Sequence, residues 1–430
     1  MTSTSEILSS RFAGTFFGAP GDALRLSIPV DPATQITLDR LVEAGLRPLI
    51  AGGAVRDTIM GKQPKDFDIE VHGAQNFDEL RAALKGLGPL NLAGRDFGVL
   101  KLRVKAEDGS LSDEIDLSLP RRDSKTGTGH RGFTIEVDPQ MSLLEATARR
   151  DLTVNALVWD PTDSLVIDLH GGLKAMEDGV LRHVSAAFSE DILRVLRVAR
   201  FATKLGFTPE RETVELCSEL QSGFAELPES RIQGELSKLI LERFFDEGFG
   251  FLKDSGWGEL LGVPRAIYPE LTRSLTRGLE RGAELKDGSA RRVLQLAVLA
   301  SLIPAGTDRV QPLTYFSAAK AEVKRALAVA DAPSARGLTA QEARQWAWDH
   351  QSITAREKLL LEASLDATAT AEVEAALAQF EELEILDGHE ADRFDSQELI
   401  RAHMAANPGL KNGPWIRELL QAERDRQYAR

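Results

Sequence analysis

The feature that most limits how this chain can fold is a change of sequence pattern near Ser189. Between Ile36 and Val166, short runs typical of β-strands alternate with glycine-rich turns. From Ser189 onward, apolar residues recur three and four positions apart, which is the spacing of amphipathic helices. We therefore predict an α+β first part with a small mixed β-sheet and helices, followed by an elongated, wholly helical second part.

Length and composition point to a soluble globular protein. The chain has 430 residues, with 43% hydrophobic and 27% charged residues. We find no apolar run long enough to cross a membrane, and Glu6 and Asp22 argue against a transit peptide. The single cysteine, Cys217, cannot form an internal disulfide, as expected in a reducing compartment. We expect a cytoplasmic protein with no membrane partner; its oligomeric state is not evident.

The distribution of charge limits how the chain could bind nucleic acid. Its net charge is −14, which argues against a protein that coats nucleic acid by neutralising phosphates. Any such contact must therefore be local. A candidate patch lies between Arg194 and Lys204, where Arg197 and Arg200 also occur and no acidic residue intervenes.

The segment GGAVRDTIMGKQPKDFDIEV, residues 52–71, carries the strongest chemical signal. We predict a buried strand at Pro48–Ala51, then the pair Gly52 and Gly53, and then a short helix that ends at Gly61. Adjacent glycines before a helix let backbone N–H groups approach an anion closely, so a triphosphate fits there. Arg56 adds a cationic fork for phosphate.

Two carboxylates follow the glycine pair. Asp66 and Asp68 begin an alternating run to Val71, which predicts a half-buried strand with both carboxylates on one face. Such oxygen ligands suit Mg²⁺, and two ions about 3.5–4 Å apart can hold the attacking and leaving oxygens of a phosphoryl transfer. An isolated pair of this kind is usually only a solvated strand face, but the glycine motif beside it favours the metal site. Further strands are expected at Val99–Val104 and Glu114–Leu119.

Later segments add two polar clusters. In ARRDLTVNAL, residues 148–157, the simplest interpretation is that Asp151 and Thr153 cap a helix that starts at Val154. In SEDILRVLRVARF, residues 189–201, Asp191 and Arg194 are spaced to share one face of a helix, as are Glu190 and Arg194. A carboxylate and a guanidinium together can read the edge of a base, although on an unassigned helix such residues more often form an ordinary surface ion pair.

Taken in order, these segments resemble the nucleotidyltransferase superfamily, and specifically the class II CCA-adding enzyme and bacterial poly(A) polymerase family. The matching segments are GGxVRD, DxD, RRDxTxNA, an acidic Gly-Gly segment at residues 168–184 and EDxxRxxRxxRF. The resemblance extends over about residues 46–271, and residues 409–420 are similar to a loop-to-helix element near the C-terminus of some relatives.

The resemblance implies a site, substrates and partners. It assigns two Mg²⁺ ions to Asp66, Asp68 and a third carboxylate, Asp116, with Glu114 as the alternative. It assigns CTP and ATP as substrates and the 3′ end of tRNA or another RNA as the partner. Nucleotide binding is assigned to the residues already named in the motifs, which are Gly52, Gly53, Arg56, Arg150, Asp151, Asn155, Asp191, Arg194 and Arg197.

The same resemblance suggests a domain organisation. We expect an N-terminal extension at residues 1–35, a nucleotidyltransferase head at 36–166, and a helical neck with base recognition at 167–230. A helical body at 231–310 and a helical, RNA-binding tail at 311–430 would follow.

Several alternatives stay open at this point. Poly(A) polymerases, and enzymes specialised to add only CC or only A, share every motif named above. An inactive RNA-binding homologue and a small-molecule nucleotidyltransferase are more remote, because the metal carboxylates are intact and the helical half is long. The run GTGHRG at residues 127–132 spells a dinucleotide-binding fingerprint, but no strand leads into it and no helix follows it, so we expect a loop. The histidines form no HExxH motif.

Overall fold

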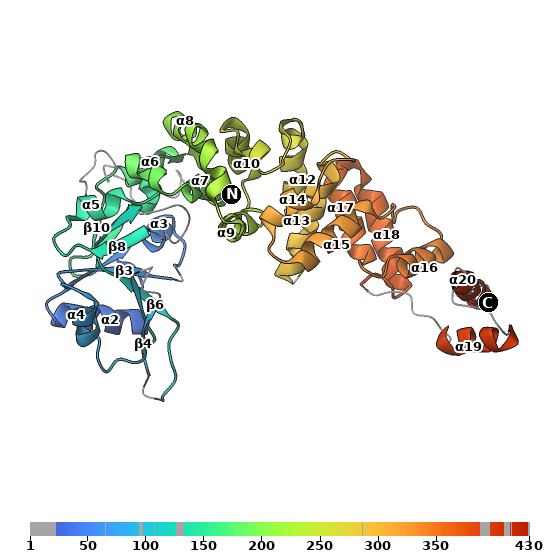
Figure 1. Cartoon of the computed structure of the whole chain (residues 1–430), viewed down its shortest axis with the longest axis horizontal. Coiled ribbons are helices and arrows are strands. Elements are labelled where there is room, and N and C mark those ends of the chain that lie inside the picture. Colours follow the sequence, from blue (N-terminus) through green and yellow to red (C-terminus); the bar gives the residue numbers. More distant parts are fainter. Residues whose placement is uncertain are drawn as a thin grey trace. The chain divides into compact units, whose positions relative to one another are not determined.

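The computed structural model describes residues 23–64, 66–93, 98–106, 108–125, 133–285, 287–387, 396–407, 413 and 415–428 (Figure 1). The chain divides into two compact units, Met1–Tyr268 and Pro269–Arg430. The first unit contains the β-sheet and several helices, and the second is helical throughout its described part. This confirms the predicted α+β class with a mixed sheet followed by helices.

A mixed eight-stranded sheet forms the centre of the first unit. Its strands, in spatial order, are β1 (Ala23–Arg25), β10 (Leu165–Ile167), β9 (Val158–Asp160), β2 (Arg47–Ala51), β3 (Asp68–His72), β6 (Ile115–Ser118), β5 (Val99–Leu102) and β4 (Leu90–Ala93). Within this described sheet, β3 and β6 pair in parallel and the other neighbours are antiparallel. The smaller pairs are β7 (Arg121–Lys125) with β8 (Phe133–Val137), and β11 (Val180–Leu181) with β12 (Thr208–Pro209).

The registers of two strand pairs position the predicted site. Ala51, the last residue of β2, pairs with Asp68 of β3, so the glycine turn that follows β2 lies beside that carboxylate. On its other side Asp68 pairs with Asp116 of β6. Apolar residues such as Ile69 and Leu117 alternate with these acids and are fully buried, which fixes the faces of the strands.

Short helices connect the strands of the first unit. They are α2 (Pro32–Glu43), α3 (Gly53–Ile59), α4 (Phe77–Ala83), α5 (Leu143–Ala148), the 3₁₀ turn η1 (Thr153–Asn155) and α6 (Gly172–Asp178). Gly61 follows α3 with φ +77°, as predicted for a left-handed helix end. The glycines before α6 also act as a turn, because both oxygens of the Asp168 carboxylate accept hydrogen bonds from N–H groups of its first turn.

A group of helices completes the first unit. These are α7 (Leu193–Leu205), α8 (Arg211–Glu219), α9 (Glu229–Leu239), α10 (Phe245–Asp254) and α11 (Trp257–Leu260). Helix α7 packs against both α9 and α10. A Cβ atom on Gly248 of α10 would lie 2.7 Å from the Ala199 carbonyl oxygen, so glycine there permits close helix packing. One face of α7 is thereby held in the core.

The second unit consists of helices in its described residues. They are α12 (Tyr268–Arg281), α13 (Gly288–Leu302), α14 (Val310–Phe316), α15 (Lys320–Asp331), α16 (Ala340–Asp349), α17 (Ala355–Leu365), α18 (Thr370–Glu382), α19 (Ser396–Ala406) and α20 (Trp415–Tyr428). Two begin with capping boxes, Thr339 with Glu342 and Thr354 with Glu357. No helix in the described residues is long and apolar enough to span a bilayer.

Some expectations concern boundaries or residues that the structure does not test. Residues 23–35 contribute β1, which pairs with β10, and the start of α2. Residues 1–22, the glycine-rich run 127–132 and most of the segment 408–414 lie outside the described residues. The division at residues 268 and 269 is a separate observation, and the predicted head, neck, body and tail boundaries stay predictions.

Candidate nucleotide-binding and catalytic site

The glycine turn after β2 is shaped by contacts that leave little room for a side chain. Gly52 has φ +80° and precedes α3. A Cβ atom there would lie 3.0 Å from Nη1 of Arg150 and 3.3 Å from the Asn155 carbonyl oxygen. The Gly52 N–H donates to the Leu157 carbonyl at 2.9 Å, so this N–H has a partner within the protein, and anion binding by the backbone of the glycine turn stays a prediction. The turn brings Arg150 and η1 against the start of α3.

Arg56 serves mainly to join the elements of the site. Its side chain is only 2% exposed, and its guanidinium donates to the side-chain oxygen of Asn155 and pairs with Asp57 at 2.7 Å. The guanidinium also lies 5.1 Å from the centroid of the Phe201 ring on α7. The open phosphate fork expected from the sequence is therefore largely engaged within the protein, although Arg56 still lines the cavity described next.

A cavity of about 490 Å³ collects most of the predicted residues. The predicted residues that line it are Gly52, Gly53, Arg56, Asp66, Asp68, Arg150, Asp151, Asn155 and Arg197. Lys62, Arg200 and Lys204 also line this cavity and bring further positive charge to it. Arg200 and Lys204 belong to the basic patch seen in the sequence, whereas Lys62 carried no signal beyond its place in the turn after Gly61.

The carboxylates approach one another from different elements. Asp66 precedes β3 by two residues, so the prediction that both aspartates lie on the strand is wrong for Asp66. Both nevertheless line the large cavity. Desolvation raises the pKa of Asp68, the charge of Arg150 opposes this rise, and the carboxylates of Asp116 and Asp66 add to it. A cation bound between these carboxylates would relieve this mutual repulsion.

The third carboxylate lies where the strand register places it. Asp116 pairs with Asp68 across β6 and β3, whereas Glu114 precedes β6. The ammonium group of Lys101 lies 3.3 Å from Asp116 and also bonds Glu114. Oxygen ligands of this kind fit Mg²⁺ chemically. Among the described residues, however, no three His, Cys, Asp or Glu side chains are already gathered as a metal cluster.

Asp151 links the 3₁₀ turn η1 to helix α7. The carboxylate is 6% exposed and accepts hydrogen bonds from Arg197 at 2.7 Å and from the Asn155 amide at 3.1 Å. Burial raises its pKa, but the Arg197 charge and these hydrogen bonds outweigh burial, so the pKa lies below its usual value. No side chain caps η1, so the alternative in which Asp151 and Thr153 cap a helix at Val154 is wrong.

Helix α7 brings guanidinium groups to the cavity. Arg197 and Arg200 both pair with Glu235 of α9, at 3.5 and 2.5 Å. The guanidinium of Arg197 lies 5.4 Å from the centroid of the Phe201 ring, and that of Arg200 lies 4.5 Å from it. The Arg56 guanidinium contacts the same ring. Glu235 was not predicted as a site residue, because its partners come from a helix distant in sequence.

Asp191 and Arg194 are not paired as the helical spacing predicted. Helix α7 starts at Leu193, so Glu190 and Asp191 lie before it, at the end of the 3₁₀ turn η2 (Ala186–Glu190). The Asp191 carboxylate accepts two hydrogen bonds from Arg231 of α9, at 2.9 and 3.2 Å. Arg194 donates to the Ala187 carbonyl at 2.5 Å.

Neither Asp191 nor Arg194 is among the described residues that line the large cavity. Helix α7 nevertheless reaches that cavity through Arg197, Arg200 and Lys204, which follow these two residues along the chain. Residues of α7 therefore line the cavity, whereas Arg194 lies in the first turn of this helix and Asp191 precedes it.

Comparison with known proteins places this site in a family context. Residues 49–182 match the family model described as the poly A polymerase head domain. The multifunctional CCA protein of Pasteurella multocida (strain Pm70) is 35% identical over 285 residues, which cover 65% of this chain and 62% of that protein. That of Xylella fastidiosa (strain M12) is 38% identical over 205 residues, covering 47% of this chain and 44% of that protein. The chain thus spans about half the length of these curated relatives.

Solved structures show the same fold. The Bacillus stearothermophilus CCA-adding enzyme in complex with CTP is 20% identical, with a TM-score of 0.62 over 91% of this chain and 92% of that chain. The Thermotoga maritima CCA-adding enzyme complexed with tRNA is 19% identical, with a TM-score of 0.61 over 97% and 92% of the two chains. The resemblance to class II CCA-adding enzymes that the motifs indicated is confirmed.

Proposed function

We propose that this protein, with its poly A polymerase head domain and the fold of CCA-adding enzymes, adds CCA to the 3′ end of tRNA. It would use CTP and ATP, need no nucleic-acid template, and release pyrophosphate. The observation that carries the proposal is the large cavity. It joins a glycine turn, carboxylates and cationic side chains from the head with the guanidinium groups of α7. The names of the relatives and the ligands of the structural neighbours agree with this assignment.

In this proposal the large cavity holds the nucleoside triphosphate. Lys62, Arg150 and Lys204 line it and can neutralise the phosphates. Asp151 and Asn155 would meet the ribose, because they are polar, nearly buried and already bonded to each other. A site whose polar groups are held in place before substrate arrives loses less free energy on binding.

The carboxylates fit a divalent cation in kind, and Asp66, Asp68 and Asp116 would hold it. When bound, two Mg²⁺ ions would lower the pKa of the RNA 3′-hydroxyl and neutralise the charge of the leaving pyrophosphate. The residues of this chain would orient the triphosphate. No covalent enzyme intermediate is required, so a nucleophilic side chain is not needed.

We assign selection of the base of the incoming nucleotide to Asp191 and Arg194. A carboxylate has about four lone-pair positions, so Asp191 can accept from a base amino group while it keeps hydrogen bonds from Arg231. Arg194 can donate to ring acceptors, so the pair would favour CTP and ATP over UTP and GTP.

We place the reaction in the cytoplasm, which agrees with a free and buried Cys217. The helices of residues 231–430 would carry the tRNA-binding body and tail.

One experiment tests the proposal against its alternatives. Labelled CTP and ATP are supplied separately and together to tRNA lacking CCA, to tRNA ending in CC, and to an unstructured RNA. A CCA-adding enzyme extends the first RNA with both nucleotides and the second with one A. Long A tracts on the unstructured RNA would identify a poly(A) polymerase, and activity with only one nucleotide would identify a CC-adding or A-adding enzyme. No incorporation into any RNA would refute the proposal.

A further inference from the structure

A second cavity of about 240 Å³ is also lined by Asp68. The residues that matter in its wall are Asp68, Glu70, Asp116, Arg121, Arg149 and Arg150. Asp68 and Arg150 also line the large cavity, so the two cavities meet at these side chains. Asp116 lines the second cavity and is not among the residues that line the first.

This division of carboxylates suggests a division of substrates. In an in-line phosphoryl transfer, the attacking oxygen approaches from the side opposite the leaving group. If the triphosphate occupies the large cavity, the attacking hydroxyl must reach its α-phosphate from a neighbouring space beside the same carboxylates, and the second cavity, which Asp68 and Asp116 line, is such a space. We propose that the second cavity receives the 3′-terminal nucleotide of the RNA, and that Arg121 and Arg149 bind the phosphodiester that precedes it. This inference rests on the proposed function.

The charges of the second cavity suit a phosphodiester. Arg149 lies 3.6 Å from Glu70, close enough for attraction but beyond hydrogen-bond distance. Glu70 is nearly buried and also bonds His72 at 2.9 Å. Arg121 is tethered by a 3.2 Å hydrogen bond from its guanidinium to the Gly98 carbonyl. Both arginines line the cavity, and a planar guanidinium can donate two parallel hydrogen bonds to a phosphate.

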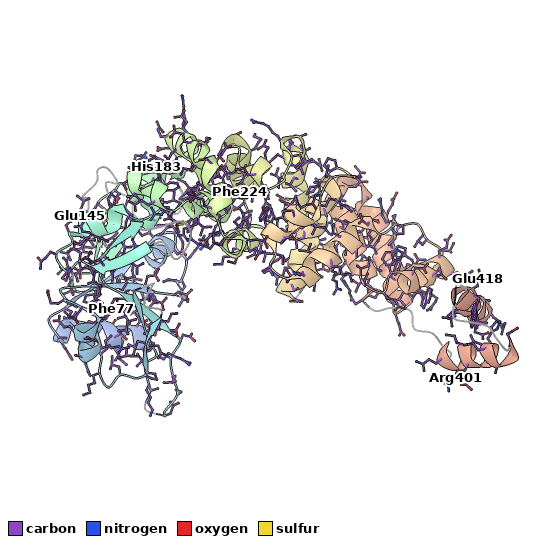
Figure 2. The ribbon with its side chains drawn as sticks, in the orientation of Figure 1. Phe77, Glu145, His183, Phe224, Arg401 and Glu418 are labelled. Atoms are coloured by element: carbon purple, nitrogen blue, oxygen red, sulfur yellow. The ribbon has the colours of Figure 1, made fainter. Side chains whose placement is uncertain are left out.

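The neighbouring arginine supplies a matched control. Arg122 follows Arg121 on β7, and successive side chains of a strand point to opposite faces. It is 56% exposed and pairs with Asp138 at 2.8 Å and with Glu145 at 3.5 Å. Figure 2 labels Glu145, which lies on α5. A substitution at Arg122 removes the same charge from the same strand without touching the second cavity.

The first test compares Arg121→Gln, Arg149→Gln and Arg122→Gln in steady-state kinetics with the full chain. We expect the first two to raise KM for tRNA lacking CCA by about 10-fold to 100-fold, with less than a twofold change in KM for CTP. Arg149→Lys should recover part of the loss, because it keeps the charge but not the planar fork. Arg122→Gln should change neither KM. A larger effect on KM for CTP than on KM for tRNA would overturn the inference.

A second test addresses the phosphate itself and does not depend on activity. Binding of a labelled tRNA that ends in CC is measured by fluorescence anisotropy, with its last phosphodiester either natural or replaced by a neutral methylphosphonate. In the wild-type protein the neutral linkage should weaken binding of the RNA about 10-fold. In Arg149→Gln, which already binds the natural RNA more weakly, the neutral linkage should cause little further loss of affinity. If the substitution and the neutral linkage weaken binding independently, so that their fold-losses of affinity multiply, the inference is overturned. It is also overturned if the neutral linkage does not weaken binding to the wild type.

The two proposals fail in different ways. An active wild type whose arginine variants bind and extend RNA normally would refute the phosphodiester site alone. A wild type that binds RNA through Arg149 but incorporates no nucleotide would refute the proposed function alone. If Arg121→Gln lowers the thermal unfolding midpoint, the comparison of Arg149→Gln with Arg149→Lys still decides the question, because the lysine variant keeps the positive charge beside Glu70.

Discussion

Asp68 and Asp116 lie side by side in the parallel strands β3 and β6, residue against residue. The segments that carry them are far apart in the chain, and the register of one strand pair brings their carboxylates together. The parallel pairing also gives each aspartate the same position relative to the buried residue that follows it, Ile69 or Leu117. The geometry of the proposed metal site therefore depends on the sheet as much as on the acids.

The first prediction separates the metal carboxylates from their acidic neighbour. Asp68→Asn and Asp116→Asn should each lower the single-turnover rate of nucleotide addition by roughly 10³-fold, because the ions contribute several kcal/mol to the transition state. Glu114→Gln should cost less than about 10-fold, since Glu114 precedes β6 and bonds Lys101. Circular dichroism checks that the fold is retained. Equal losses at Glu114 and Asp116 would contradict the assignment of the third carboxylate.

The second prediction concerns choice of nucleotide. Asp191→Ala and Arg194→Ala should relax discrimination of CTP and ATP against UTP and GTP more than they slow addition of the correct nucleotide. Arg231→Gln should relax it in the same direction, because Arg231 holds both oxygens of the Asp191 carboxylate. Competition between labelled nucleotides measures the ratio of kcat/KM values. Unchanged discrimination in all three variants would remove these residues from base selection.

The third prediction tests the glycine turn. Gly52→Ala should lower stability by about 1–3 kcal/mol through its positive φ and should also raise KM for CTP, because the new Cβ meets Arg150 at 3.0 Å. Gly45→Ala is the control: Gly45 has φ +79° and nothing within 4 Å of the added Cβ. Chemical denaturation and KM for CTP are compared in both variants. A similar rise of KM in Gly45→Ala would mean that strain alone explains the effect.

The fourth prediction concerns pH. Burial lowers the pKa of His183 below the ordinary 6.5, and its ring bonds Thr213 at 2.9 Å (Figure 2 labels His183). The unfolded chain therefore takes up a proton at a higher pH than the folded chain does. The contribution of neutral His183 to the free energy of unfolding is therefore complete above pH 6.5, and it is lost as the pH falls below 6.5 toward the lower pKa of the folded state. His183→Gln should flatten the decline in the free energy of unfolding between about pH 7.5 and 5.5. The pKa of His170 is also lowered by burial, so part of the pH dependence of the free energy of unfolding should remain in His183→Gln.

Much of this protein follows from local sequence. The glycine pair, the helix that ends at Gly61 and the alternating run to Val71 predict β2, α3 and β3, because turn chemistry and side-chain period act over a few residues. The amphipathic spacing beyond Ser189 predicts the helices in the same way. The motifs also identify Asp68, Arg150, Asp151 and Asn155 as members of one site before any fold is known.

Local spacing failed where partners come from distant segments. Asp191 and Arg194 are three positions apart, yet α7 begins only at Leu193, and the Asp191 carboxylate accepts hydrogen bonds from Arg231 of α9 instead. Arg56 likewise bonds Asn155, and Arg197 bonds Asp151, across large gaps in the chain. The sequence alone determined which chemical groups are present and how each short element forms. Only the tertiary structure decided which charges neutralise one another, because opposite charges pair by distance in space after the helices and strands have packed.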